Sequence, residues 1–405
     1  MSELSYLEKL LDGVEVEWKL LGDASFFEIA NNGRKPVKSS LRIAGKTPYY
    51  GANNIQDYVD GYTHDGEYVL IAEDGSASLE NYSIQYATGK FWANNHVHVV
   101  RGKERVHSRF LYHYLCIVNF LPFLTGGGRA KLTKGQLIEI PVPIPCPENP
   151  EKSLAIQSEI VRILDTFSAL TAELTAELNM RKKQYNYYRD QLLSFDEEQE
   201  KPIYLEKLLD GVEVEWKLLG DASFFEIANN GRKPVKSSLR IAGKTPYYGA
   251  NNIQDYVDGY THDGEYVLIA EDGSASLENY SIQYATGKFW ANNHVHVVRG
   301  KTRVNSRFLF HYLHIVNFIP FLTGGVRAKL TKGQLIEISV PIPCPDNTEK
   351  SLAIQAEIVR ILDKFDTLTN SITEGLPREI ELRQKQYEYY RDLLFSFPKP
   401  ETVSN

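Results

Sequence analysis

Apolar positions follow two different periods along this chain. In about the first 150 residues they form short runs bounded by glycine, such as Tyr68–Ala72 and His96–Val100, which predict β-strands. Ser108–Phe120 has a more helical spacing, and Leu132–Leu137 is expected to form a short turn. We therefore expect this part of the chain to fold as a mixed α+β globule.

The period then changes to that of a long packed helix. Five prolines between Pro141 and Pro150 predict a stiff extended segment that cannot be helical. Beyond it, apolar residues spaced 4-3-4-3-4 form a heptad seam, which is typical of a helix that packs on another helix. The seam consists of Ile156, Ile160, Ile163, Phe167, Leu170 and Leu174, and a similar spacing continues at Tyr185, Tyr188 and Leu192.

The first half of the chain is repeated in the second half. Tyr6–Lys103 recurs without change as Tyr204–Lys301, an offset of 198 residues that holds as far as Asp363 with only ten substitutions. These include Glu104 to Thr302, Cys116 to His314, Gly128 to Val326 and Pro141 to Ser339. A unit of this length is a domain rather than a solenoid repeat. Two such domains present one surface twice, which suits a repeated target such as an inverted half-site on duplex DNA.

The two helical regions match at both ends but differ in the middle. The first holds two tandem Thr-Ala-Glu-Leu units at 171–178, whereas the second holds Gly375 and Pro377, which should weaken and break a helix. Aligning Gln184-Tyr185 with Gln386-Tyr387 makes the second arm four residues longer. Matching seams in one chain most simply pack as an antiparallel pair, which would place the globules at opposite ends.

These patterns predict six segments. The expected boundaries are 1–150 for the first globule, 151–195 for the first helix, 196–203 for a linker, 204–348 for the second globule, 349–397 for the second helical region and 398–405 for a tail.

Charge is unevenly distributed along the chain. The net charge of −7 argues mildly against a stand-alone nucleic-acid-binding protein, which is usually strongly basic. Asn31–Pro48 nevertheless carries five cationic residues and no acidic one, and Asn229–Pro246 repeats it. The alternative for such a run is a solvated loop face. The three cysteines lack metal-ligand spacing, and the sequence contains no signal peptide and no membrane-spanning apolar run, so we expect a cytoplasmic protein.

Catalytic motifs are absent from the sequence. Gly45-Lys46-Thr47 resembles the end of a phosphate loop, but Ser40 stands where the first glycine belongs. Asn149-Pro150 is followed by Glu151 rather than by the proline and aromatic residue that amino-methyltransferases use. The histidines lack the spacing of a zinc site. We therefore expect neither catalysis nor a bound cofactor or metal in this chain.

The polar clusters instead suggest recognition of DNA. Asparagine can read adenine in the major groove, whereas lysine and arginine contact phosphates. Turn chemistry is the alternative for the asparagines, and core packing is the alternative for the aromatic residues. The candidate DNA contacts in the first globule are Arg34, Lys35, Lys38, Lys46, Tyr50, Asn53, Asn54, Asn94, Asn95, His96, Arg129 and Lys131. Their copies are Arg232, Lys233, Lys236, Lys244, Tyr248, Asn251, Asn252, Asn292, Asn293, His294, Arg327 and Lys329.

Several stretches, in the same order in both halves, resemble the DNA-specificity subunit of type I restriction-modification systems. The stretches that carry this resemblance are Val16–Asp23, Pro48–Ile55, Val69–Gly75, Leu137–Pro145 and Ile156–Asp165. The tandem Thr-Ala-Glu-Leu units are similar to those of the IC subfamily. The resemblance covers essentially the whole chain.

The resemblance implies a noncatalytic subunit with two target recognition domains joined by two conserved helices, in a pseudo-two-fold arrangement. It implies that each domain reads half of a split double-stranded DNA site, while the helices set the spacer and bind two methyltransferase subunits, to which restriction subunits attach. S-adenosylmethionine, ATP and magnesium would then belong to the partners. Family members usually carry two different domains, so near-identical domains predict an inverted-repeat site.

Three other functions remain possible from the sequence. A stand-alone regulatory DNA-binding protein would bind DNA tightly by itself. A scaffold without a DNA role would leave the repeated basic stretch unexplained, and an enzyme would need a site of unrecognised type.

Overall fold

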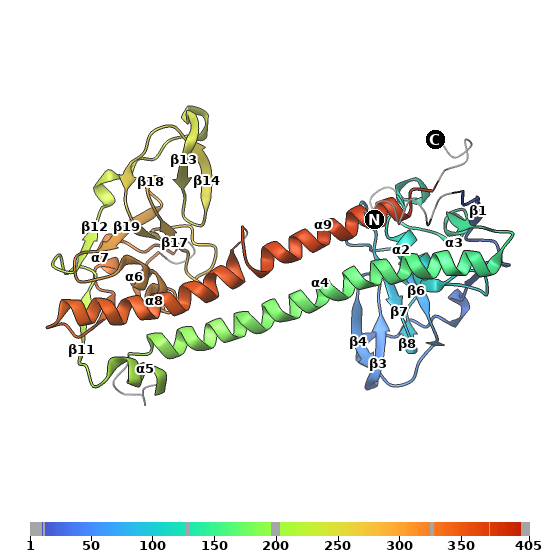
Figure 1. The fold of residues 1–405 in the computed structure, drawn as a ribbon, viewed down its shortest axis with the longest axis horizontal. Coiled ribbons are helices and arrows are strands. Elements are labelled where there is room, and N and C mark those ends of the chain that lie inside the picture. The colour runs from blue at the N-terminus through green and yellow to red at the C-terminus, as the bar shows by residue number, and fades with distance from the viewer. Residues whose placement is uncertain are drawn as a thin grey trace. The chain divides into compact units, whose positions relative to one another are not determined.

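The computed structural model describes residues 10, 13–126, 130–195, 203–324, 328–371 and 373–397 (Figure 1). The chain forms two compact units, Met1–Leu174 with Ile380–Asn405, and Thr175–Glu379. Each unit therefore combines one globule with parts of both helical regions.

The first globule contains three small sheets. The strands are β1 (Val16–Leu20), β2 (Phe27–Ile29), β3 (Ala44–Tyr50), β4 (Ile55–Val59), β5 (His64–Asp65), β6 (Tyr68–Ala72), β7 (Ile84–Ala87), β8 (Lys90–Ala93), β9 (Val97–Gly102) and β10 (Pro141–Pro145). β1 pairs with β10, and the other sheets have the orders β2-β9-β6-β7 and β4-β3-β8-β5. All pairings are antiparallel except that of β3 with β8.

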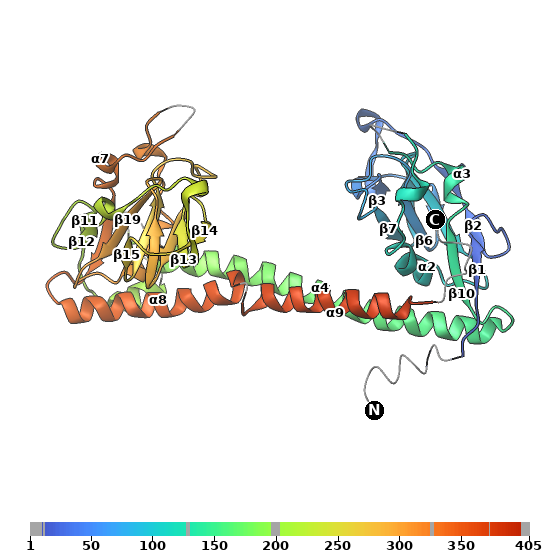
Figure 2. The same cartoon turned by 90° about the horizontal axis from the view of Figure 1, so that it is seen from above.

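The predicted strand Tyr68–Ala72 is confirmed as β6, which is buried along its whole length in the middle of its sheet. Helix α2 (Ser108–Leu115) contacts β6 and β7 (Figure 2). Phe110 and Leu111 of α2 lie in the same apolar core as Val69 and Ile71. The helix is shorter than expected, and a 3₁₀ turn at Leu121–Phe123 follows it. The expected turn at Leu132–Leu137 contains the short helix α3 (Lys134–Leu137), with a capping box between Thr133 and Gln136.

The second globule has the same topology. Its strands are β11 (Val214–Leu218), β12 (Phe225–Ile227), β13 (Ala242–Tyr248), β14 (Ile253–Val257), β15 (His262–Asp263), β16 (Tyr266–Ala270), β17 (Ile282–Ala285), β18 (Lys288–Ala291), β19 (Val295–Gly300) and β20 (Ser339–Pro343). Its helices are α6 (Ser306–Leu313) and α7 (Lys332–Leu335), and α5 (Ile203–Leu209) precedes β11. The sheet orders repeat those of the first globule.

Three helices make up the two long helical regions. These are α4 (Pro150–Leu193), α8 (Thr348–Asn370) and α9 (Leu376–Leu394). The predicted break of the second region is confirmed. Gly375, between α8 and α9, has a φ of +83°. Pro377 lies in the first turn of α9, where the backbone N–H groups have no partner within the helix, so the missing N–H of proline costs no hydrogen bond.

The helices pair in an antiparallel manner within each unit, as the matching seams predict. In the first unit, Phe167 in the first half of α4 stacks on Tyr390 near the end of α9, with ring centroids 5.2 Å apart. In the second unit, Tyr188 near the end of α4 stacks on Phe365 of α8 at 5.4 Å. The end of each arm also enters a globule core, Leu394 and Phe395 in the first unit and Leu192 and Leu193 in the second.

Two details of the helical region differ from expectation. Pro150 does not extend the preceding segment but begins α4, because proline is compatible with the first turn of a helix. The residues of the heptad seam do not all pack against the same part of the structure. Ile156 and Ile160 are buried in the globule core together with Leu164, which the seam omits, whereas Leu170 of the seam is 37% exposed. Periodicity identifies an apolar face, but it does not identify what covers that face.

Candidate nucleic-acid interface

Three predicted DNA contacts in each globule are exposed cations. Lys35 and Lys38 flank Pro36-Val37 in the segment before β3, and Lys46 lies on β3 itself. Within the described residues, none of the three has an ion-pair partner, and the same is true of Lys233, Lys236 and Lys244. Their ammonium groups are therefore available to phosphate oxygens.

Arg34 and Lys131, by contrast, both pair with Glu73 at the end of β6. The Arg34 guanidinium lies 2.6 Å and the Lys131 ammonium 3.0 Å from the Glu73 carboxylate. Arg34 also donates to the backbone carbonyls of Asn31 and Val97. Burial alone would raise the pKa of Glu73, but its hydrogen bonds to Arg34 and Lys131 hold that pKa below its usual value. Arg34 is therefore a structural cation, whereas Lys131 remains partly accessible.

Asn53 and Asn94 use their amides to build loops. The Asn53 side chain donates to the Gly75 carbonyl at 2.9 Å and accepts from the Ala77 amide at 2.8 Å. The Asn94 side chain is almost fully buried and accepts from the His96 amide. Both contacts are the turn chemistry that the sequence left open, and Asn251 and Asn292 repeat them.

The remaining predicted contacts are more accessible. Asn54 and Asn95 are exposed, and His96 is about half-exposed with its Nδ1 2.5 Å from Asp74. Tyr50 is partly buried and packs edge-on against Phe91, and burial raises the pKa of its hydroxyl. Arg129 and Arg327 lie outside the described residues. The copies Tyr248, Asn252, Asn293 and His294 have the corresponding environments.

The fold brings many of these residues into one loop cluster, which we define as residues 51–54, 73–77, 94–96 and 131. The backbone carbonyl of Glu73 accepts from the Leu132 amide, and the backbone amide of Glu73 donates to the His96 carbonyl. Asp74 forms an isolated β-bridge with Lys131. The backbone amide of Asn94 donates to the Tyr50 carbonyl, and this bond joins the end of β3 to the loop cluster. Lys38 and Lys46 lie outside this cluster. Lys38 precedes the 3₁₀ turn before β3, and Lys46 lies on β3 in the β4-β3-β8-β5 sheet.

Sequence reasoning missed the acidic and buried members of this cluster. Glu73 and Asp74 directly follow the fully buried strand β6. At this strand end, the Glu73 carboxylate contacts Arg34 and the Asp74 carboxylate contacts His96. His98 is also buried there. Asn31 donates to His98 Nδ1, so the Nε2 hydrogen is directed to the Leu132 carbonyl at 2.7 Å. Burial lowers the pKa of His98, which keeps it neutral at pH 7.

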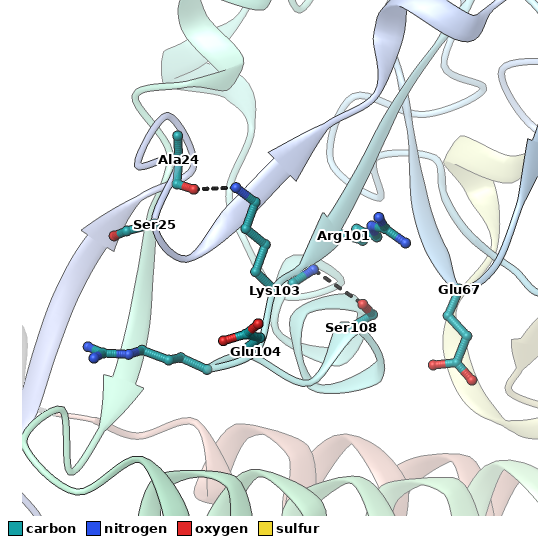
Figure 3. A pocket seen from close by; sticks show the side chains of 9 residues that line it. Ala24, Ser25, Glu67, Arg101, Lys103, Glu104 and Ser108 are labelled. Carbon is teal, nitrogen blue, oxygen red and sulfur yellow. Dashed lines mark hydrogen bonds between the residues drawn. The ribbon is translucent and has the colours of Figure 1, made fainter.

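A separate polar cavity of about 750 Å³ lies between the segment before β2 (Ala24 and Ser25), the end of β9 and the start of α2 (Figure 3). Three of its charged groups, Lys103, Arg101 and Glu67, are engaged with the protein itself, whereas Glu104 is exposed. Lys103 donates to the Ala24 carbonyl, Arg101 pairs with Glu28, and Glu67 accepts from the Tyr86 hydroxyl. Its lining contains two serines and no histidine.

Among the described residues, no cluster of histidine, cysteine, aspartate or glutamate has the arrangement of a metal site. No helix within the described ranges is both long enough and apolar enough to cross a membrane. What the surface does offer is a set of exposed cations beside loops rich in amide and carboxylate groups, present twice.

Known proteins share this organisation. The type I restriction modification DNA specificity domain matches residues 15–181 and again 213–382. A Haemophilus influenzae protein provisionally named a type I restriction enzyme specificity subunit is 46% identical, over 97% of this chain and 98% of its own. The EcoR124I/EcoR124II specificity subunit of Escherichia coli is 37% identical over the whole of both chains.

A solved structure has the same fold. The crystal structure of the type I restriction-modification S subunit from M. genitalium covers 96% of this chain with a TM-score of 0.65 at 17% identity. Taken with the two domain matches, these relationships show that the chain belongs to the family of type I restriction-modification DNA specificity subunits, which are noncatalytic.

Proposed function

We propose that this chain selects the DNA site of a type I restriction-modification complex and that each globule reads one half of an inverted repeat. The observation that carries the proposal is the identity of Tyr6–Lys103 and Tyr204–Lys301. The identical stretch includes the three exposed lysines (Lys35, Lys38 and Lys46) and nearly all of the loop cluster in both copies. Identical surfaces recognise identical half-sites.

Recognition divides between two kinds of contact. Lys35, Lys38 and Lys46 contact phosphates, and Asn54, Asn95 and His96 reach base edges. Arg34, Asn53 and Asn94 act through the loops that they hold in place. Alanine at a base-reading residue should cost about 1 to 3 kcal/mol and relax one position of the site.

The chemistry belongs to partner subunits in this proposal. S-adenosylmethionine, ATP and magnesium bind to methyltransferase and restriction subunits. The complex works in the cytoplasm, where the three free cysteines of this chain would remain reduced.

Exposed aromatic residues on the helices support two methyltransferase docking sites. Tyr187 on α4 is 61% exposed and Tyr389 on α9 is 54% exposed, and each packs edge-on against the tyrosine that follows it. Aromatic residues of this kind are common anchors of protein interfaces. Tyr187→Ala and Tyr389→Ala should each remove one methyltransferase subunit in native mass spectrometry, whereas Leu20→Ala on β1 should remove none.

The helices also set the spacer between half-sites. One Thr-Ala-Glu-Leu unit adds roughly 6 Å of helix, against about 3.4 Å per base pair. Deleting residues 175–178 should therefore shorten the nonspecific spacer by one or two base pairs. An unchanged spacer would refute this role.

The overall function is tested by mapping adenine methylation in a host that expresses the cognate methyltransferase with and without this chain. Methylation at a split motif only when the chain is present supports the proposal. Tight DNA binding by the chain alone, without methylation, would favour a stand-alone regulatory protein instead.

A further inference from the structure

Two large aliphatic side chains protrude next to the exposed lysines of each globule. Leu41 is 69% and Ile43 is 72% exposed, and their copies Leu239 and Ile241 are 70% and 71% exposed. We call Leu41 and Ile43 the apolar tip. Single exposed apolar residues are ordinary, but these two border the same small cavity and form a patch that favours a binding partner.

The backbone beneath the apolar tip is fixed by hydrogen bonds. The Leu41 amide donates to the Lys38 carbonyl in a 3₁₀ turn at Ser39–Leu41, and the Asp60 amide donates to the Ile43 carbonyl at 2.8 Å. Arg42, between the two apolar residues, donates to the Val37 carbonyl and lies 4.1 Å from the Tyr49 ring centre. The tip is therefore held outward before any partner binds, which reduces the entropy lost on insertion.

The space beside the tip is too small for a folded partner segment. Leu41 and Ile43 border a cavity of about 160 Å³ whose wall includes the stacked rings of Tyr49 and Trp92. Ligand pockets usually measure about 300 to 1,000 Å³, so this hollow is not the size of a typical small-molecule site. The tip itself is the protruding feature.

The surrounding charge favours a polyanion. Lys35, Lys38 and Lys46 lie within a few residues of the tip and are exposed, and residues 31–48 contain no acidic side chain. On the neighbouring strand, Asp57 is paired with Arg42 at 3.3 Å, and just beyond that strand the exposed Asp60 lines the same small cavity as the tip. The three lysines therefore outnumber the carboxylates next to the tip, one of which is already paired. An aliphatic wedge framed by cations is the arrangement by which proteins enter a DNA stack, where leucine and isoleucine separate adjacent base pairs.

We propose that the apolar tip of each globule inserts between two base pairs of its half-site and unstacks that step. This inference rests on the proposed function and adds a shape-dependent component to it, because the cost of unstacking depends on the step that is opened. Specificity would then include a base-pair step that no polar side chain contacts.

The test uses the full chain assembled with its methyltransferase subunits and duplexes that carry 2-aminopurine at successive positions of the methylated motif. The methylated adenine itself is left unlabelled, because a methyltransferase extrudes its target base. The fluorescence of this base rises when it unstacks. The wild-type complex should raise it at one step in each half-site. Each double variant, Leu41→Ala with Ile43→Ala or Leu239→Ala with Ile241→Ala, should remove only part of the increase, because an inverted repeat lets either globule occupy either half-site. The four substitutions together should abolish it.

Affinity gives a second readout. Each double variant should weaken binding to the specific duplex by roughly tenfold, with little change for unrelated DNA, because the lysines remain. Leu20→Ala, which truncates another exposed leucine, should change neither signal. The substituted side chains are largely exposed, so folding is expected to persist and circular dichroism checks it.

Two outcomes would overturn the wedge. One is a fluorescence increase that is undiminished when all four residues are alanine or that is absent in the wild type. The other is loss of a methyltransferase subunit from a double variant without a change at the DNA, which would make the tip a protein contact. Neither outcome resembles failure of the proposed function itself, which would appear as the absence of any methylated motif.

Discussion

Replacing Glu73 with glutamine in the first globule alone tests whether this carboxylate organises the loop cluster. Glu73→Gln keeps the size of the side chain but removes the charge that faces Arg34 at 2.6 Å and Lys131 at 3.0 Å. The second globule keeps the same arrangement at Glu271 and serves as a reference within the same molecule.

The two ion pairs contribute unequally. The side chains of Arg34 and Glu73 are only 18% and 16% exposed, so their interaction is largely shielded from water. A hydrogen bond to a charged group in such a place contributes about 1.5 to 3 kcal/mol. Lys131 is 45% exposed, and a surface pair of this kind adds less than about 1 kcal/mol. We expect the variant to destabilise the first globule by about 2 to 3 kcal/mol.

Calorimetry of the single-copy variant measures this effect. For a unit of some 200 residues, the expected loss lowers the melting temperature by roughly 5 to 10 °C, so the two globules should melt as separate transitions. Glu28→Gln is the matched control, because Glu28 makes an equally short pair with Arg101 in which both partners are more than a third exposed. A variant that melts as the wild type does, or a control that shifts as far, would refute the reasoning.

The pH dependence follows from the lowered pKa of Glu73. A carboxyl whose folded pKa lies below its unfolded value stabilises the fold above that unfolded value, which is near 4.5, and loses this contribution as pH falls through the folded pKa. The difference between wild type and Glu73→Gln should therefore be full at pH 7 and shrink below pH 4.5. A difference that grows on acidification would contradict the assignment.

Three further predictions address the backbone and the phosphate contacts. Gly45→Ala should destabilise the first globule by about 1 to 3 kcal/mol, because its Cβ would lie 2.3 Å from the Val59 carbonyl oxygen; Gly135→Ala, with no close neighbour, is the calorimetric control. Gly375→Ala should lower the stability of the second unit, since a Cβ there would lie 2.4 Å from the Thr367 carbonyl oxygen at a φ of +83°. Lys35→Ala with Lys38→Ala should weaken binding to all DNA sequences alike and reduce the salt slope by about 1 per lost phosphate contact. An unchanged slope in a salt titration would exclude phosphate contacts at these lysines.

The large-scale organisation could be read from the sequence because it depends on local signals. The repeat defines two similar globules, the seven-residue period predicts the long helix, and Gly375 with Pro377 predicts the break between α8 and α9. The period and the break act through neighbouring residues, and the repeat is found by comparing the two halves of the sequence, so none of these signals requires knowledge of distant contacts.

The details of the candidate interface could not be read in the same way. Arg34 and Asn53 have the composition of recognition residues, but their partners, Glu73 and Gly75, lie far away in the sequence. Whether a polar side chain in a turn faces solvent or caps another loop depends on such long-range pairing. The apolar tip was missed because an exposed leucine and a buried leucine look alike until the fold is known.

The most direct test of the central claim is the methylated motif itself, determined by single-molecule sequencing of DNA from a host that carries this chain and its methyltransferase. The two near-identical globules predict an interrupted palindrome, with the same half-site on each strand. Two half-sites of unrelated sequence would contradict the claim that each copy reads DNA through its repeated surface.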